Sequence, residues 1–146
     1  MSSAYNKFYD FSEQQVRGVH DWDAHTFKIA LTDTAPVATQ VSLDLVTNNP
    51  PPASANGYPS GGTATTITIS ETTGTTTVQG TQVTFTASGG TIGPFRYAIL
   101  YNDSATSPAD ALIAWFDYGA STMLNDTEVV NIKFNSASPG TIFTLA

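Results

Sequence analysis

The chain has 146 residues, no cysteine and a net charge of −7, with five fixed cations at Lys7, Arg17, Lys28, Arg96 and Lys133. Without cysteine it can form neither a disulfide framework nor a thiolate site, and cations this scattered do not form the phosphate-binding patch that nucleic-acid recognition needs. Only 12% of the residues are charged, against roughly 25% in an average globular domain. Much of the surface must therefore be neutral and polar, or be covered by another protein.

The length suits a single domain with a sizeable core. The N-terminal stretch MSSAYNKFYDFSEQQ lacks the apolar segment of a signal peptide, and no apolar run approaches the length of a membrane span. We therefore expect a soluble protein made in a cytoplasm, without a membrane partner.

Residues 1–25 are predicted to form an N-terminal arm that contains one short helix. Ser12 and Gln15 match the capping-box pattern S-x-x-Q, and Gly18 is a typical helix stop. These signals predict a helix over residues 13–17.

The arm also carries a heavy apolar load, from Tyr5, Phe8, Tyr9 and Phe11. Chain termini usually fray unless they are tied down, so four aromatic side chains indicate that the arm is docked. It can dock on its own domain or on a neighbouring subunit, and we expect the neighbouring subunit.

The segment HTFKIALTD is predicted to be a strand with Phe27, Ile29 and Leu31 on one face. The next segment, APVATQVSLDLVT, fits a helix and a strand equally well. Residues 48–62 are rich in proline and glycine, which favours a surface loop with a binding role or with mobility.

From Thr63 onward the pattern indicates β-structure, because β-branched residues favour a pleated surface over a helix. Short strands are predicted at TTITIS, TTTVQG, QVTFTAS, PFRYAILYN, ALIAWFDYG, EVVNIKF and TIFTLA. With the earlier strand this makes about eight. The fold class is therefore all-β, an antiparallel β-sandwich or jelly roll over residues 26–146.

The two aromatic segments PFRYAILYN and ALIAWFDYG are predicted to pair as a hairpin across residues 104–110. Alternation places one set of side chains in the sandwich core: Phe95, Tyr97, Ile99, Ile113 and Trp115. The opposite face carries Leu100, Leu112, Phe116 and Tyr118. A second apolar face needs its own cover, so we expect the arm or a neighbour to lie on it. Trp115, Phe116 and Tyr118 could alternatively stack on a sugar.

Catalytic and metal patterns are weak. The motif HDWDAH holds both histidines, His20 and His25, but a spacing of five places them on different faces of a strand or helix. A capped loop is favoured over a metal site. The carboxylate pairs Asp103 with Asp110 and Asp117 with Asp126 could serve glycoside hydrolysis, although acidic residues in turns are more often solvated. We expect no enzyme activity, no catalytic residue, no metal and no cofactor.

Three blocks of the sequence resemble a family of small structural proteins of tailed bacteriophages. They are NKFYDFSEQQVRGVHDWDAHTFKIALTDTAPVAT, then NGYPSGGT, then ASGGTIGPFRYAILYNDSATSPADALIAWFDYG. The resemblance implies a virion component assembled in the bacterial cytoplasm, most like a capsid decoration (cement) protein. It implies the major capsid protein as partner and a homo-oligomer, a dimer or trimer, on the capsid surface.

The residues expected at the interface are Tyr5, Phe8, Tyr9, Phe11, Leu100, Leu112, Phe116 and Tyr118. The alternative is a tail or fibre adhesin that recognises a host surface glycan through the aromatic hairpin and the 48–62 loop.

Overall fold

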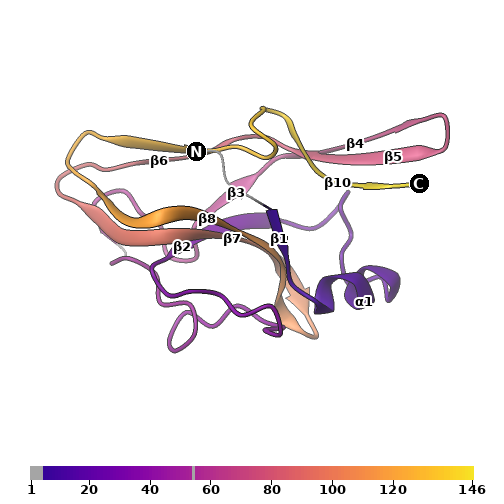
Figure 1. Cartoon of the computed structure of the whole chain (residues 1–146), viewed down its shortest axis with the longest axis horizontal. Coiled ribbons are helices and arrows are strands. Elements are labelled where there is room, and N and C mark those ends of the chain that lie inside the picture. Colours follow the sequence, from indigo (N-terminus) through magenta and orange to yellow (C-terminus); the bar gives the residue numbers. More distant parts are fainter. Residues whose placement is uncertain (1–4, 54) are drawn as a thin grey trace.

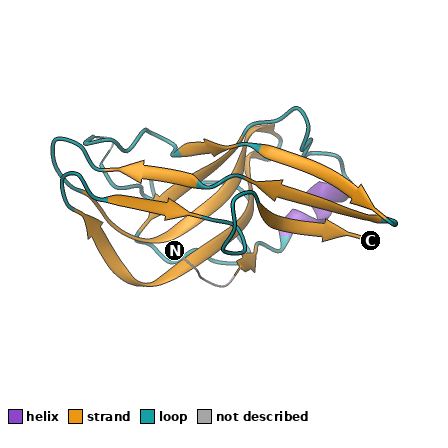
Figure 2. Cartoon of the chain, turned by 90° about the horizontal axis from the view of Figure 1, so that it is seen from above, coloured by secondary structure: helices purple, strands orange, loops and turns teal. Residues whose placement is uncertain are grey.

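The computed structural model describes residues 5–53 and 55–146, which form a mostly β fold with one short helix (Figures 1 and 2). The described elements are β1 Tyr5–Lys7, α1 Asp10–Val16, β2 Phe27–Thr32, β3 Thr63–Thr65, β4 Ile67–Thr72, β5 Thr75–Gly80, β6 Val83–Thr86, β7 Ile92–Thr106, β8 Ala109–Leu124, β9 Val129–Ile132 and β10 Gly140–Leu145. The strands form antiparallel sheets in the orders β1-β8-β7-β2-β3, β10-β5-β4 and β6-β9. The predicted all-β, sandwich-like class is confirmed. The strands beyond the expected eight are β1 and β3.

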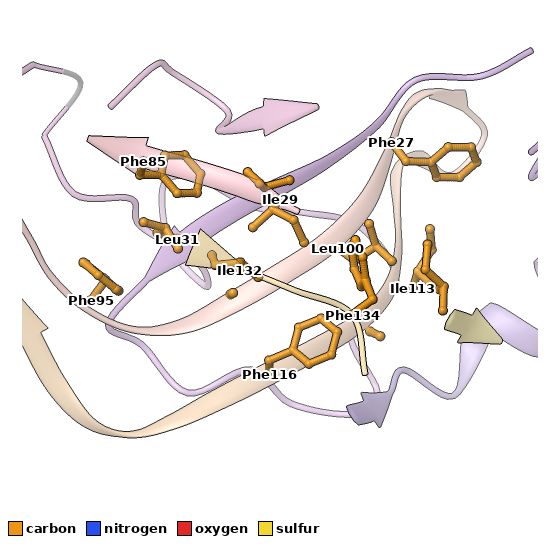
Figure 3. Close-up of a cluster of buried hydrophobic side chains, with 14 of the residues drawn as sticks. Phe27, Ile29, Leu31, Phe85, Phe95, Leu100, Ile113, Phe116, Ile132 and Phe134 are labelled. Atoms are coloured by element: carbon orange, nitrogen blue, oxygen red, sulfur yellow. The ribbon is translucent and has the colours of Figure 1, made fainter. Parts of the chain in front are cut away.

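The main core lies between the five-stranded sheet and the two smaller sheets. Figure 3 shows buried side chains from β2, β6, β7, β8, β9 and the segment after β9 gathered in one cluster, among them Phe27, Ile29, Leu31, Phe85, Phe95, Leu100, Ile113, Phe116, Ile132 and Phe134. The predicted shared face of Phe27, Ile29 and Leu31 is confirmed. Burial of aromatic and branched side chains from both layers supplies the main stabilisation.

A second apolar cluster covers the opposite face of the five-stranded sheet. It contains Phe8, Ala30, Leu43, Ile99, Tyr101 and Leu112, with Leu45 and Trp115 packed against it. The hairpin is therefore apolar on both faces, as predicted, and both faces are covered by this chain itself.

The assignment of side chains to the two faces was wrong in part. Ile99 and Trp115 lie in the outer cluster, whereas Leu100 and Phe116 lie in the main core. The cause is irregular pairing: Leu100 opposes Ala114 and Tyr101 opposes Leu112, so β8 carries one extra residue. A β-bulge of this kind reverses the in-and-out alternation beyond it. The pairing is also irregular between Phe95 and Tyr97. Phe95 and Ala98 both lie in the main core, so the alternation along β7 is reversed beyond this point.

The described part of the arm docks on its own domain, so the expected docking on a neighbour is wrong for residues 5–25; residues 1–4 lie outside the described residues. Strand β1 pairs with β8, with Tyr5 opposite Phe116. The backbone N–H of Phe8 donates to the carbonyl of Ile113 at 3.1 Å. Phe8 and Phe11 are both buried. The arm thus acts as an edge strand of the five-stranded sheet.

The helix begins earlier than predicted. It covers Asp10–Val16, its N-cap is Tyr9 and no side chain caps it, so Ser12 lies inside the helix and the predicted capping box does not form. Burial of Phe11 sets the start instead. The stop at Gly18 is confirmed: Gly18 has φ +79°, and Val19 N–H and Gly18 N–H donate to the carbonyls of Gln14 and Gln15. This is a Schellman end.

The segments between β2 and β3 form neither of the regular structures considered for residues 35–47. Ser42 makes an isolated bridge to Ala111. The 48–62 loop, described except for residue 54, is anchored by the buried Tyr58, whose hydroxyl accepts from Leu31 N–H at 2.9 Å. Gly62, at φ +85°, lies against the Ile29 carbonyl where no Cβ fits. These contacts hold the loop against the sheet.

Candidate binding site

A groove of about 400 Å³ lies between one face of the three-stranded β10-β5-β4 sheet and the chain from α1 to residue 23. Its lining residues are Gln15, Gly18, His20, Asp21, Trp22, Asp23, Ile69, Thr76, Val78, Phe143 and Leu145. In Figure 1, β4, β5 and β10 reach to the right above α1, and the C-terminus lies at the end of this sheet. Pockets of this size can hold several side chains or a small ligand.

The sheet wall of the groove consists of side chains that are adjacent across the three strands. Val78 of β5 lies opposite Ile69 of β4 and Phe143 of β10, and Thr76 lies opposite Leu145. Opposed residues point to the same face. Exposure rises from 4% at Val78 to 44% at Ile69 and 63% at Leu145. The apolar face of the sheet therefore continues beyond the layer that covers it.

Aromatic rings form the floor of the groove. Trp22 stacks on Phe27 with ring centroids 4.0 Å apart and an interplanar angle of 1°, and the ring of Phe143 lies 5.2 Å from that of Trp22. The Trp22 indole N–H donates to Gln15 Oε1 at 2.7 Å. This bond and the stacked rings fix the floor in one geometry, so the groove is formed before any partner arrives.

One rim of the groove is acidic. Asp21 and Asp23 line it, and no Lys or Arg is among its described lining residues. Asp21 Oδ1 accepts from the backbone N–H groups of Asp23 and Ala24, both at 3.1 Å. These bonds hold the loop and fix the position of one carboxylate. The rim consequently attracts a cation and repels an anion.

His20, which also lines the groove, belongs to a polar cluster with Asn102 and His25. The Asn102 amide nitrogen lies 3.2 Å from His20 Nδ1 and 3.0 Å from His25 Nδ1. Asn102 Oδ1 accepts from Ser104 N–H at 3.0 Å, which fixes the orientation of the amide. Because the amide nitrogen can only donate, both ring nitrogens must accept, and we assign the ring protons to Nε2 in each histidine.

The environment of His20 favours its neutral form. Burial lowers the pKa of His20 to about 4, with repulsion from His25 as the smaller cause. The His20 side chain has 4% residual exposure, and its Nε2 has no hydrogen-bond partner within the described part of the chain. His20 is therefore uncharged at neutral pH and joins the loop under the groove to β7.

The capped loop predicted for HDWDAH is confirmed by the two bonds to Asp21 Oδ1. Both histidine rings meet at Asn102, because residues 20–25 form an irregular loop and not the strand or helix in which this spacing would separate them. Among residues 5–53 and 55–146, no group of three or more His, Cys, Asp or Glu side chains is placed to hold a metal ion.

Most of the predicted interface residues lie inside the fold. Five have residual exposures of 0–6%: Phe8, Phe11, Leu100, Leu112 and Phe116. Their role at an interface is corrected to a role in the two apolar clusters. The other three keep substantial exposure, 39% for Tyr5, 69% for Tyr9 and 50% for Tyr118, and they remain candidates for contact with a partner.

The sugar platform is not formed as a set. Trp115 is half-buried and packs on Phe8 with ring centroids 4.6 Å apart. Phe116 is buried in the main core. Tyr118 alone of the three is exposed, so three adjacent rings do not present a common face for stacking.

Three of the four carboxylates considered for glycoside hydrolysis are engaged in other contacts. Asp103 pairs with Lys28 at 2.9 Å, and Asp126 accepts from Gly89 N–H at 2.8 Å. Asp117 accepts two bonds from Arg96, at 2.8 and 3.0 Å, and these hold the pKa of Asp117 below its ordinary value. Burial and the charge of Asp103 raise the pKa of Asp110.

The sequence reasoning did not single out the sheet residues of the groove. A signal was present: Ile67 and Ile69 alternate within a Thr-rich strand, and Phe143 and Leu145 alternate near the C-terminus. Such alternation predicts a strand with one apolar face, but it does not show where the covering layer ends.

A scan against protein-family models, a search of curated proteins and a search of solved structures each found no match to this chain. In the described residues, no helix is long and apolar enough to cross a membrane.

Proposed function

We propose that this chain is a structural protein of a bacteriophage particle, which binds the assembled capsid as a decoration protein and uses the groove to contact a shell subunit. The observation that carries the proposal is the apolar face that extends beyond its cover, with Ile69 and Leu145 exposed beside the fixed rings of Trp22 and Phe143. Exposed apolar side chains gathered at a preformed hollow mark protein contact sites.

Two further properties fit such a role. The low charge and abundant Thr and Ser give a surface that can approach a repeating protein lattice without strong repulsion. A decoration protein gains affinity because each copy touches several subunits, and it stabilises the shell by mass action if it binds the assembled state alone. The resemblance to phage structural proteins supports the choice of the capsid as partner.

The test uses shells assembled from the major capsid protein of the same genome. Wild-type protein should sediment with the shells in a fixed ratio to the capsid subunits. The double variant Ile69→Asp with Leu145→Asp should lose most of this binding, because two charges then enter the apolar face. The matched control is Val129→Asp, which changes a side chain with 50% exposure on β9 and should bind normally.

Failure of the wild-type protein to bind shells would overturn the proposal. If the same protein bound host cells, and binding were competed by surface polysaccharide, the adhesin alternative would take its place. The copy number per particle separates the two, since a decoration protein follows the lattice and an adhesin is present in few copies.

A further inference from the structure

We infer that the groove receives an extended segment of the partner that presents a large apolar side chain and, two residues away, a lysine or arginine, and that this segment adds as a strand to the free edge of β4. The identity of the partner as a shell subunit rests on the proposed function. The chemistry of the segment rests on the groove and on β4.

The apolar part of the segment follows from the shape and lining of the groove. Three strands supply its wall through Ile69, Val78 and Phe143, and Trp22 supplies the floor. Val78 is already buried, whereas Ile69 is 44% and Leu145 is 63% exposed. A side chain placed here would remove apolar surface of the partner and of this chain from water together.

The cation follows from the rim. Asp21 and Asp23 line the groove without a described Lys or Arg beside them, and Asp21 is held in place by its bonds to the loop backbone. A second copy of this chain would bring the same acidic rim and the same net charge of −7, so a symmetric contact through the groove is repulsive. Charge complementarity favours a basic segment of another protein.

The extended conformation follows from β4. In the order β10-β5-β4 this strand pairs with β5 on one side, and its other edge has no strand partner among the described residues. Five of its six residues are exposed, and its sequence, ITISET, lacks the Lys and Pro that usually protect an edge strand. A strand added here would direct alternate side chains to the face of Ile69, which is the groove.

The experiment uses the full chain and short blocked peptides rich in Thr and Val with a central Leu-Thr-Lys, Leu-Thr-Glu or Ser-Thr-Lys, in which the first and third side chains share one face of the strand. They are named Leu-Lys, Leu-Glu and Ser-Lys after these two residues. Binding is measured by backbone amide chemical shifts, which respond to affinities as weak as millimolar. The Leu-Lys peptide should shift the amides of β4 and of groove residues such as Trp22. The Leu-Glu peptide should bind several-fold more weakly, and the Ser-Lys peptide should give little binding.

The contribution of the two rim carboxylates can be tested separately. Asp21→Asn and Asp23→Asn keep the shape of the rim, and in the first variant the side-chain amide oxygen can still accept the two backbone bonds. Each change should reduce the preference for Leu-Lys over Leu-Glu by about 1.4- to fivefold, since an exposed charge pair contributes about 0.2–1 kcal/mol. The affinity for an otherwise identical Leu-Ser peptide should stay constant.

Equal affinity for the Leu-Lys and Leu-Glu peptides, or shifts confined to sites away from β4 and the groove, would overturn the inference. The two proposals fail separately. Peptide binding in a protein that ignores the shells contradicts the capsid function alone. Normal shell binding by Ile69→Asp with Leu145→Asp contradicts the groove inference and leaves the capsid function standing.

Discussion

The β7–β8 hairpin exposes less apolar surface than its composition indicates, and the β10-β5-β4 sheet exposes more. The hairpin is rich in large apolar side chains, yet both of its faces are covered, and Leu100 and Ile113 are fully buried. The three-stranded sheet is rich in Thr, yet it exposes Ile69 and Leu145. Aromatic density marks the region that organises the fold. Exposure depends on where the covering layer ends.

The largest expected effect separates these two regions. Leu100→Ala removes a fully buried side chain from the main core and should lower the free energy of unfolding by about 2–5 kcal/mol. Ile69→Ala, on the uncovered sheet, should lower it by about 0.5 kcal/mol or less. Urea denaturation of both variants measures the difference. Similar losses would mean that the sheet is as tightly covered as the hairpin.

Acid should weaken the connection between the groove loop and β7. The pKa of His20 is about 4 in the folded protein and 6.5 as the ordinary value. The unfolded chain therefore binds a proton first as the pH falls, and stability is lost between about pH 6.5 and pH 4. The shift corresponds to about 3 kcal/mol. This contribution to stability is fully present above pH 6.5, and the free energy of unfolding measured across this pH range tests it.

The matched control for this pH dependence is His20→Phe, which keeps a ring beside Phe11 and Trp22 and removes the titrating group. Asn102 still has His25 and the Val19 carbonyl as acceptors. The variant should show a much smaller loss between pH 6.5 and 4. An unchanged acid dependence would assign the effect to other groups.

Tyr58 anchors the 48–62 loop to β2 of the five-stranded sheet. Strand β3 pairs with β2 as far as Ile29, and beyond it the Tyr58 hydroxyl accepts from Leu31 N–H. Tyr58→Phe keeps the ring contact with Phe85 and leaves a buried donor unpaired, which should cost about 1–3 kcal/mol. Tyr118→Phe, at an exposed position, should have no measurable effect. Equal thermal stability of the two variants would contradict the anchoring role.

Much of the fold could be predicted because the evidence for it is local. Alternating β-branched and aromatic residues located the strands, and the hairpin followed from two such segments with a short turn between them. The two faces of the hairpin could not be predicted fully, because one extra residue near Ile113 reverses the alternation and no composition signal marks a bulge. The helix start failed for a related reason: the burial of Phe11 outweighed the local capping pattern at Ser12.

The candidate site could not be predicted from the sequence because it forms from segments that are far apart along the chain. The loop that carries Trp22 meets β10 near Phe143 only in the folded chain. The convergence of His20 and His25 on Asn102 likewise depends on an irregular loop, for which periodicity gives no rule. Sequence patterns indicated which residues are apolar or capped. The arrangement of the layers decided which of them stay open to a partner.

The smallest expected effect comes from the ion pair between Arg96 and Asp117, where the hairpin meets solvent. Both side chains are about one-third exposed, so the two bonds should contribute only about 0.2–1 kcal/mol, although the paired geometry is good. The pKa of Asp117 is lowered, chiefly by the bonds from Arg96. Its contribution is therefore present above the ordinary carboxyl pKa and lost as the pH falls through the lowered value. A double-mutant cycle with Asp117→Asn and Arg96→Gln should give a coupling energy in this range that shrinks at about 1 M salt. A coupling well above 1 kcal/mol that resists salt would contradict this prediction. It would show that the pair is shielded from solvent and that the covered part of the hairpin extends farther along β8.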